Sequence, residues 1–124
     1  MAISNSNIAG LLNIKAKSGD SFIRDFTFTT NDDTPLPIDL TGYTVLLQIR
    51  ESSDKSKDPI LSADLSNYMS IGGADHNIIS IVIPGEDMRF PPKNYMWDLE
   101  LISPTNVTTT YLEGTFRLEK DISQ

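Results

Sequence analysis

The fold is decided by residues 93–122, which have the sequence KNYMWDLELISPTNVTTTYLEGTFRLEKDI. Apolar side chains occupy the odd positions from Tyr95 to Leu101, and they occupy even positions at Leu112, Phe116 and Leu118. Such alternation is typical of a strand with one buried face and one wet face. Two alternating runs joined by a short turn predict a C-terminal β-hairpin whose tip is Thr105-Asn106.

This turn determines which residues face each other across the hairpin. Trp97 is expected opposite Gly114, where its ring covers the gap that a glycine leaves in a sheet. Asp98 is expected opposite Glu113, a like-charge pair that costs a few tenths of a kcal/mol unless a cation such as Arg117 intervenes. We therefore interpret Trp97, the single tryptophan, as the centre of a core and not as the floor of a binding site.

The remainder of the chain shows further short runs of β-forming residues. Strands are expected at residues 11–17, 22–28, 43–50 and 78–83, with a short edge element at 60–65. The run at 78–83 is apolar on both faces, which is typical of a central strand covered on both sides. The sequence contains no amphipathic helix long enough to cover a sheet, and at most one short helical turn is expected near residues 84–89.

These patterns predict an all-β protein, an antiparallel β-sandwich of about six to seven strands. Residues 11–124 are expected to form this single domain, preceded by a flexible N-terminal arm at residues 1–10, which is rich in Ser and Asn. The expected core consists of in-phase apolar residues: Phe26, Phe28, Val45, Leu47, Ile49, Ile81, Tyr95, Trp97, Leu99, Phe116 and Leu118.

Composition restricts the classes of function. The chain has 124 residues, a formal net charge of −7 and no cysteine. The excess of acidic residues argues against a nucleic-acid partner, because phosphate binding requires clustered Lys and Arg. The lack of cysteine excludes disulfides and thiolate zinc sites. The sequence begins without a secretory signal and contains no apolar run of membrane-spanning length, so we expect synthesis without export and no membrane partner.

The chemistry-bearing residues do not assemble into a catalytic, metal or cofactor site. The single histidine, His76, has no activated serine to work with and is interpreted as an exposed loop residue, with a ligand or pH-sensitive contact as the alternative. The turn at residues 31–33, together with Asp39, lacks the spacing of a calcium loop and is interpreted as solvated turn chemistry, with calcium as the alternative. Asp98 and Glu100 are assigned to a wet strand face. We expect a protein that is not an enzyme and has no cofactor.

Two groups of motifs resemble small immunoglobulin-like domains of tailed-bacteriophage virion proteins, the kind found in baseplate and tail-fibre attachment proteins. The first group comprises GDSF at residues 19–22, PIDLTGYTV at 37–45 and QIR at 48–50. The second group comprises YMWDLEL at residues 95–101, LEGTF at 112–116 and KDIS at 120–123. The resemblance covers nearly the whole chain from Gly19 onward.

The resemblance implies an immunoglobulin-like sandwich and a structural or assembly protein of a phage or prophage virion, such as a tail, baseplate or neck component. Its partners would be other virion proteins and further copies of itself, and it would be made in the bacterial host cytoplasm. Docking is expected through the N-terminal arm, at Ile3, Ile8 and Leu11. Tyr95 also resembles the tyrosine corner of immunoglobulin-type sandwiches, which predicts a hydrogen bond from its hydroxyl to the backbone a few residues upstream.

The alternative hypothesis is a carbohydrate- or receptor-binding β-sandwich. This function requires two or three aromatic side chains on an exposed face, or a calcium site at residues 31–33. Tyr43, Tyr95 and Trp97 are all in phase with core positions, which favours packing over ligand contact. Edge strands at 11–17 or 60–65 are further candidates for contact with a neighbouring sheet.

Overall fold

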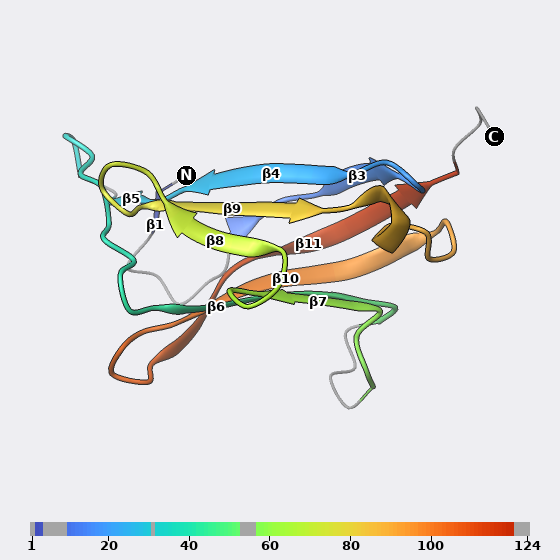
Figure 1. The fold of residues 1–124 in the computed structure, drawn as a ribbon. Coiled ribbons are helices and arrows are strands. Elements are labelled where there is room, and N and C mark those ends of the chain that lie inside the picture. Colours follow the sequence, from blue (N-terminus) through green and yellow to red (C-terminus); the bar gives the residue numbers. More distant parts are fainter. Residues whose placement is uncertain (1, 4–9, 31, 53–56, 121–124) are drawn as a thin grey trace.

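The computed structural model describes residues 2–3, 10–30, 32–52 and 57–120, which form strands and one 3₁₀ turn (Figure 1). The elements are β1 (Ala2–Ile3), β2 (Gly10–Leu11), β3 (Ile14–Lys17), β4 (Phe22–Thr27), β5 (Thr29–Thr30), β6 (Thr44–Arg50), β7 (Leu61–Asp64), β8 (Met69–Gly72), β9 (Ile78–Ile83), η1 (Gly85–Asp87), β10 (Asn94–Ile102) and β11 (Thr108–Glu119). The fold is an all-β sandwich, and the helical turn η1 falls within the predicted range 84–89.

The strands are arranged in two main sheets. The larger sheet has the order β2-β11-β10-β6-β7, and β3 follows β2 along the same edge of β11. The smaller sheet has the order β4-β9-β8 and lies over the larger one (Figure 1). A separate two-residue ladder joins β1 to β5. This topology leaves the larger sheet with one face toward the core and one face toward the outside.

The core lies between the two sheets and is built from the inward positions of both. Phe26 on β4 stacks on Trp97 of β10 with ring centroids 6.2 Å apart, and Phe22 meets Phe116 of β11 edge to face at 5.4 Å. All eleven residues of the expected core are buried. The structure also buries residues outside that set, among them Ile14, Leu40, Met69, Met88 and Leu101.

The β10–β11 hairpin has the predicted register from Asn94 to Leu99, the part that lies away from the turn. Trp97 lies opposite Gly114, and Asp98 lies opposite Glu113. The predicted tip is wrong by one residue, because Ser103 and Val107 pair at the base of the turn and Asn106 adopts a left-handed conformation with φ of 66°. This arrangement is a three-residue loop closed by a residue in the left-handed region.

A β-bulge corrects the register between the turn and Trp97. Leu99 pairs with Leu112, but the next residue, Glu100, pairs with Thr110, so that Tyr111 is the extra residue of β11. A bulge of this kind shifts pairing by one position. The one-residue shift caused by the longer turn and the one-residue shift caused by the bulge therefore cancel. The apolar residues of both strands remain on the same face of the sheet.

The tyrosine-corner prediction is confirmed. The hydroxyl of Tyr95, a residue only 1% exposed, donates a hydrogen bond to the carbonyl oxygen of Pro91, four residues upstream. Phe90 packs edge to face on the Tyr95 ring, with centroids 5.1 Å apart. This corner fixes the chain where it enters β10.

The N-terminal part of the domain differs from the expected antiparallel arrangement. The predicted strand 11–17 is divided into β2 and β3, and both pair with β11 in parallel. In the expected arm, Ala2–Ile3 pairs with β5 and Gly10 pairs with Leu112, while residues 1 and 4–9 lie outside the described residues. This parallel pairing joins the two ends of the sequence, and such a long-range contact is not encoded by local patterns.

Two further expectations are corrected. The described residues form more strands than six to seven, because β8 and the two-residue strands have no strong local pattern; β8 contains Ser70 and Gly72 and is formed by pairing with β9. Strand β9 is central in its sheet, but it is not covered on both faces, since Val82 is 50% exposed. The outer face of the smaller sheet is open.

Candidate functional site

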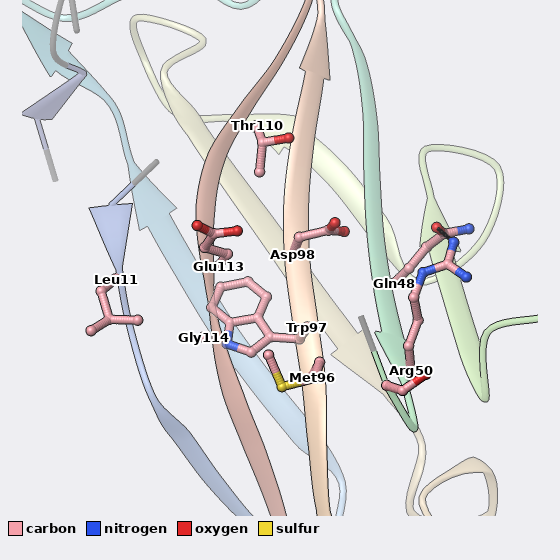
Figure 2. A pocket seen from close by; sticks show the side chains of 10 residues that line it. Leu11, Gln48, Arg50, Met96, Trp97, Asp98, Thr110, Glu113 and Gly114 are labelled. Atoms are coloured by element: carbon pink, nitrogen blue, oxygen red, sulfur yellow. Dashed lines mark hydrogen bonds between the residues drawn. The ribbon is translucent and has the colours of Figure 1, made fainter. Parts of the chain in front are cut away.

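The outer face of the larger sheet contains a hollow of about 320 Å³. It crosses β11, β10 and β6, and its lining side chains come from four strands and the segment after β6 (Figure 2). The lining residues are Leu11, Gln48, Arg50, Ser52, Met96, Trp97, Asp98, Thr110, Glu113 and Gly114. Because β10 and β6 also supply core residues from their opposite face, the hollow rests on a rigid support.

The strand register arranges these side chains in two rows. In the first row Gln48, Asp98 and Glu113 lie side by side across three strands. In the second row Arg50, Met96 and Thr115 lie side by side. Residues two apart on a strand share a face, so both rows point outward. The hollow therefore has an apolar centre with carboxylates on one side and a guanidinium on another.

The apolar part is supplied by Leu11 and Met96, which are 76% and 41% exposed. Leu11 is held in place by its neighbour Leu12, whose backbone N–H donates to the Glu113 carbonyl at 2.9 Å. Figure 2 shows Leu11 on one side of β11 and Met96 on the adjacent β10. Two exposed apolar side chains on ordered strands form a surface that a partner can cover with little loss of conformational entropy.

The floor of the hollow is formed by Trp97 and Gly114. The indole Nε1–H of Trp97 donates to the carbonyl oxygen of Leu12 at 2.8 Å, and Trp97 as a whole is only 3% exposed. A Cβ atom at Gly114 would lie 2.2 Å from the same carbonyl oxygen. Glycine is therefore required here because the N-terminal segment passes directly over β11. Trp97 stacks on Phe26 in the core and is also among the residues that line the hollow.

The carboxylates of Asp98 and Glu113 lie on adjacent strands at directly opposite positions. Like charges at such positions destabilise a sheet by a few tenths of a kcal/mol. Arg117, named as a cation that could intervene, donates from its Nη1 to Asn94 at 3.1 Å, and its Nε lies 3.9 Å from Glu119. The predicted pairing of Asp98 with Glu113 is thus confirmed.

Arg50 lies on the β6 side of the hollow and is anchored by local contacts. Its guanidinium donates to the side-chain oxygen of Gln48 and, at 2.7 Å, to the carbonyl of Lys57. The amide of Gln48 in turn donates to Ser62 of β7 at 3.3 Å. The Nε atom of Arg50 is buried and has no hydrogen-bond partner within the described part of the chain. This network fixes one positive charge at the edge of the face.

Of the three residues expected to dock a partner, Leu11 lines this surface. The backbone of Ile3 pairs with Thr30 in the short β1–β5 ladder, whereas Ile8 lies outside the described residues. Sequence reasoning missed Met96 and Arg50. A signal was available for Met96, which is an apolar residue at an even position in a strand whose core residues are odd.

The other candidate residues do not come together at this surface. His76 is exposed in a loop with φ of 54°, and its backbone carbonyl accepts the N–H of Leu40. Asp39 accepts two hydrogen bonds from Thr41, which lower the pKa of this carboxyl below its ordinary value. Asp32 and Asp33 are exposed, and Asn31 lies outside the described residues. Within the described ranges, no three His, Cys, Asp or Glu side chains are grouped to hold a metal ion.

The aromatic side chains are not displayed on the surface. Tyr95 and Trp97 are buried, and Tyr43, Tyr68 and Tyr111 are half-buried. The hydroxyl of Tyr68 donates to Asp87 at 2.8 Å. Burial raises the pKa of Tyr95 and of Tyr111. In the part of the chain that the structure describes, no helix is both long and apolar enough to cross a membrane.

Comparisons with known proteins find structural similarity only. No protein-family model matches the sequence, and no curated protein sequence matches it. Among solved structures, CopC from Methylosinus trichosporium OB3b is similar with 7% identity and a TM-score of 0.43, over 90% of this chain and 84% of that one. An immunoglobulin-domain heterodimer, ZIG-8–RIG-5 IG1–IG1, has 6% identity and a TM-score of 0.38, over 93% of this chain and 86% of that one.

Extracellular domains 3–5 of Drosophila OTK are similar with 15% identity and a TM-score of 0.30, over 90% of this chain and 33% of that one. At such identities and TM-scores, these similarities carry no information about function. The functional argument therefore depends on the surface of this chain and on the motifs in its sequence.

Proposed function

We propose that this chain is a non-enzymatic structural or assembly protein of a phage or prophage particle, a tail, baseplate or neck component that binds other virion subunits. The motifs at residues 19–50 and 95–123, which resemble small virion domains, support this function. The observation that carries the proposal furthest is the hollow on the outer face of the larger sheet, where Leu11 and Met96 are exposed on ordered strands. An apolar, rigid and partly charged face suits protein–protein contact.

Under this proposal the chain works by binding alone, in the virion, after synthesis in the host cytoplasm. The sandwich supplies a rigid support, and the outer face of β6, β10 and β11 supplies the contact. Several copies are expected in one particle, because virion components are commonly arranged with rotational symmetry.

The test is the composition of purified particles. Particles released from the bacterium that carries this gene should contain the chain in a fixed ratio to a major tail or baseplate protein, as measured by quantitative mass spectrometry. Immunogold labelling should then place it at one substructure. If the chain remains in the particle-free supernatant while intact particles sediment without it, the proposed function is wrong.

The carbohydrate- or receptor-binding alternative is less well supported by the geometry. It requires two or three aromatics on an exposed face, or a calcium site at residues 31–33. All ten aromatic side chains are buried or half-buried. Within the described ranges, no three His, Cys, Asp or Glu side chains are grouped to hold a metal ion. A glycan array tests it directly. Binding to one glycan class that is abolished by Tyr43→Ala or Tyr68→Ala, with unchanged thermal stability, would favour this alternative over a virion component.

A further inference from the structure

We propose that copies of this chain join head to tail, with the loops at one end of a copy seated in a basic hollow at the opposite end of the next copy. The inference rests on the proposed function, which expects several copies in one particle, and it names the two surfaces that would join them. Both surfaces are distinct from the hollow around Leu11 and Met96.

The basic residues are confined to one end of the sandwich. No Lys or Arg occurs in the segments 25–49, 58–88 and 94–116. The strand register brings parts of these segments together, since Thr44 and Thr108 both lie opposite Ile102. Figure 1 shows the loops 32–43, 73–77 and 103–107 at this end, opposite the end where β11 finishes. The two ends of the molecule therefore differ in charge.

The first surface, which we call the acidic end, comprises the loops 32–43, 73–77 and 103–107. The loops contact each other. The N–H of Leu40 donates to the carbonyl of His76 at 2.9 Å, and a Cβ atom on Gly42 would lie 3.2 Å from Pro104. The three loops therefore form one continuous surface.

Carboxylates and apolar side chains are exposed together on the acidic end. Its exposed carboxylates are Asp32, Asp33, Asp39 and Asp75. Asp32 and Asp33 make no ion pair within the described residues. Leu36 and Val107 are 57% and 59% exposed on the same surface. A partner that covers this end must therefore supply cations and some apolar contact.

The second surface, which we call the basic hollow, is a depression of about 480 Å³ at the opposite end. Its charged lining residues are Lys93, Arg117, Glu119 and Lys120. Lys15 and Lys17 of β3 lie beside it, because they pair with residues 117 and 119 of β11. The hollow and its border thus carry an excess of positive charge in a chain whose formal net charge is −7.

Three of these cations have no acidic partner. Lys93 and Arg117 already have carboxylate neighbours, at 3.1 Å and 3.9 Å. In contrast, Lys15, Lys17 and Lys120 are exposed and make no ion pair in the part of the chain that the structure describes. Their ammonium groups are available to carboxylates from a partner.

Charge complementarity identifies a second copy as the occupant. Two acidic ends repel each other, and so do two basic hollows, so the favourable contact joins unlike ends. Leu36, three residues after Asp33, would pack on the methylene stems of the lysines. Such a head-to-tail contact closes into a ring if the rotation between copies allows it, and otherwise continues as a stack.

The test is carbodiimide cross-linking of an equimolar mixture of ¹⁴N- and ¹⁵N-labelled full chains in low salt. Cross-links between light and heavy chains should join Asp32 or Asp33 to Lys15, Lys17 or Lys120. These bonds cannot form within one chain, because the ends are separated by the length of β11, whose twelve residues span about 35 Å. They should disappear at about 1 M NaCl, where charges are screened beyond about 3 Å.

Matched variants test whether the contact is head to tail. Asp32→Asn/Asp33→Asn alters the acidic end, and Lys15→Gln/Lys120→Gln alters the basic hollow. In sedimentation velocity, each should weaken self-association about tenfold, the effect expected from two exposed ion pairs. An equimolar mixture of the two variants should form dimers of one copy of each and no larger species, because it retains one intact pairing of hollow and loops.

The control is Asp25→Asn/Glu86→Gln, which changes the net charge as much as the acidic-end variant does, at exposed residues outside both surfaces. It should not weaken association. Equal weakening by the control and by the acidic-end variant would overturn the inference, as would a mixture of variants that associates no better than either alone.

A chain that stays monomeric and uncross-linked in low salt would also overturn the inference. Binding of an acidic peptide such as acetyl-GSDDSLG-amide to the hollow of that monomer would then identify a different protein as the occupant. None of these results bears on whether the chain is present in particles, so failure here is distinguishable from failure of the proposed function.

Discussion

At the scale of single residues, Gly114 shows how the N-terminal segment and the core depend on each other. The backbone of Leu12 passes so close to β11 that a Cβ atom at residue 114 would overlap its carbonyl oxygen. The same oxygen accepts the indole N–H of Trp97. The sequence predicts that Trp97 faces Gly114, but it explains the glycine by ring packing. The structure gives a different cause, the close approach of the Leu12 backbone, which is 102 residues away in sequence.

Gly114→Ala should therefore destabilise the fold by about 1–3 kcal/mol, the usual cost of overpacking. Gly72→Ala is the matched control, because nothing lies within 4 Å of a Cβ atom at that strand position. The control should leave the free energy of unfolding unchanged or slightly higher. Urea unfolding monitored by Trp97 fluorescence measures both, and equal stability of the two variants would contradict the packing argument.

A second residue-scale prediction concerns the tyrosine corner. Tyr95→Phe removes the hydrogen bond to the Pro91 carbonyl and leaves that oxygen without its partner inside the fold, so stability should fall by about 1–2 kcal/mol. Tyr68→Phe removes a hydroxyl bonded to Asp87 at the surface and should cost less, about 0.5 kcal/mol. Thermal unfolding compares the two, and an equal loss would show that the corner has no special role.

Two tyrosines, the buried Tyr95 and the half-buried Tyr111, also predict how stability depends on pH. Burial raises the pKa of Tyr95 and Tyr111 above the ordinary value, because the charged phenolate is disfavoured inside the fold. The unfolded chain therefore ionises first. Stability is complete below a pH of about 10 and is lost as pH rises through the folded-state pKa values. Urea unfolding at increasing pH measures this loss, which should be smaller in Tyr95→Phe; identical profiles would contradict it.

At the scale of elements, the β10–β11 hairpin separates what alternation predicts from what it does not. The phase of apolar residues places Trp97 and Leu99 inside and gives the correct pairing of Asp98 with Glu113. It does not identify the turn, because a left-handed Asn106 and a bulge at Tyr111 displace the register in compensating directions. Alternation reports which face a side chain takes, whereas turn geometry depends on backbone conformations that many short polar sequences can adopt.

The carboxylate pair provides the prediction at this scale. Glu113→Gln should raise the free energy of unfolding by a few tenths of a kcal/mol, since it removes like-charge repulsion across the hairpin. Asp25→Asn should leave stability nearly unchanged. If Glu113→Gln proves less stable than the parent at low salt, the pair is not repulsive in the folded chain.

At the scale of the whole molecule, the sequence predicts the sandwich and its inward residues, but not its outer surface. The core is recognisable because burial repeats along each strand, as at Val45, Leu47 and Ile49. The hollow is not recognisable, because it joins Leu11, Arg50 and Met96 from three strands that are distant in sequence and become neighbours only through the order β2-β11-β10-β6. The parallel pairing of β2 with β11, which brings Leu11 to this face, is likewise a long-range contact.

The central claim is that this face is covered by a virion partner, and carboxyl footprinting tests it most directly. The free chain and the chain within purified particles are labelled with a carbodiimide and an amine, and each carboxyl is quantified by mass spectrometry. Glu113 should be labelled in the free chain and protected in the particle, while Asp25, on the other sheet, stays equally reactive in both. Equal labelling of Glu113 in the free chain and in the particle would contradict the claim.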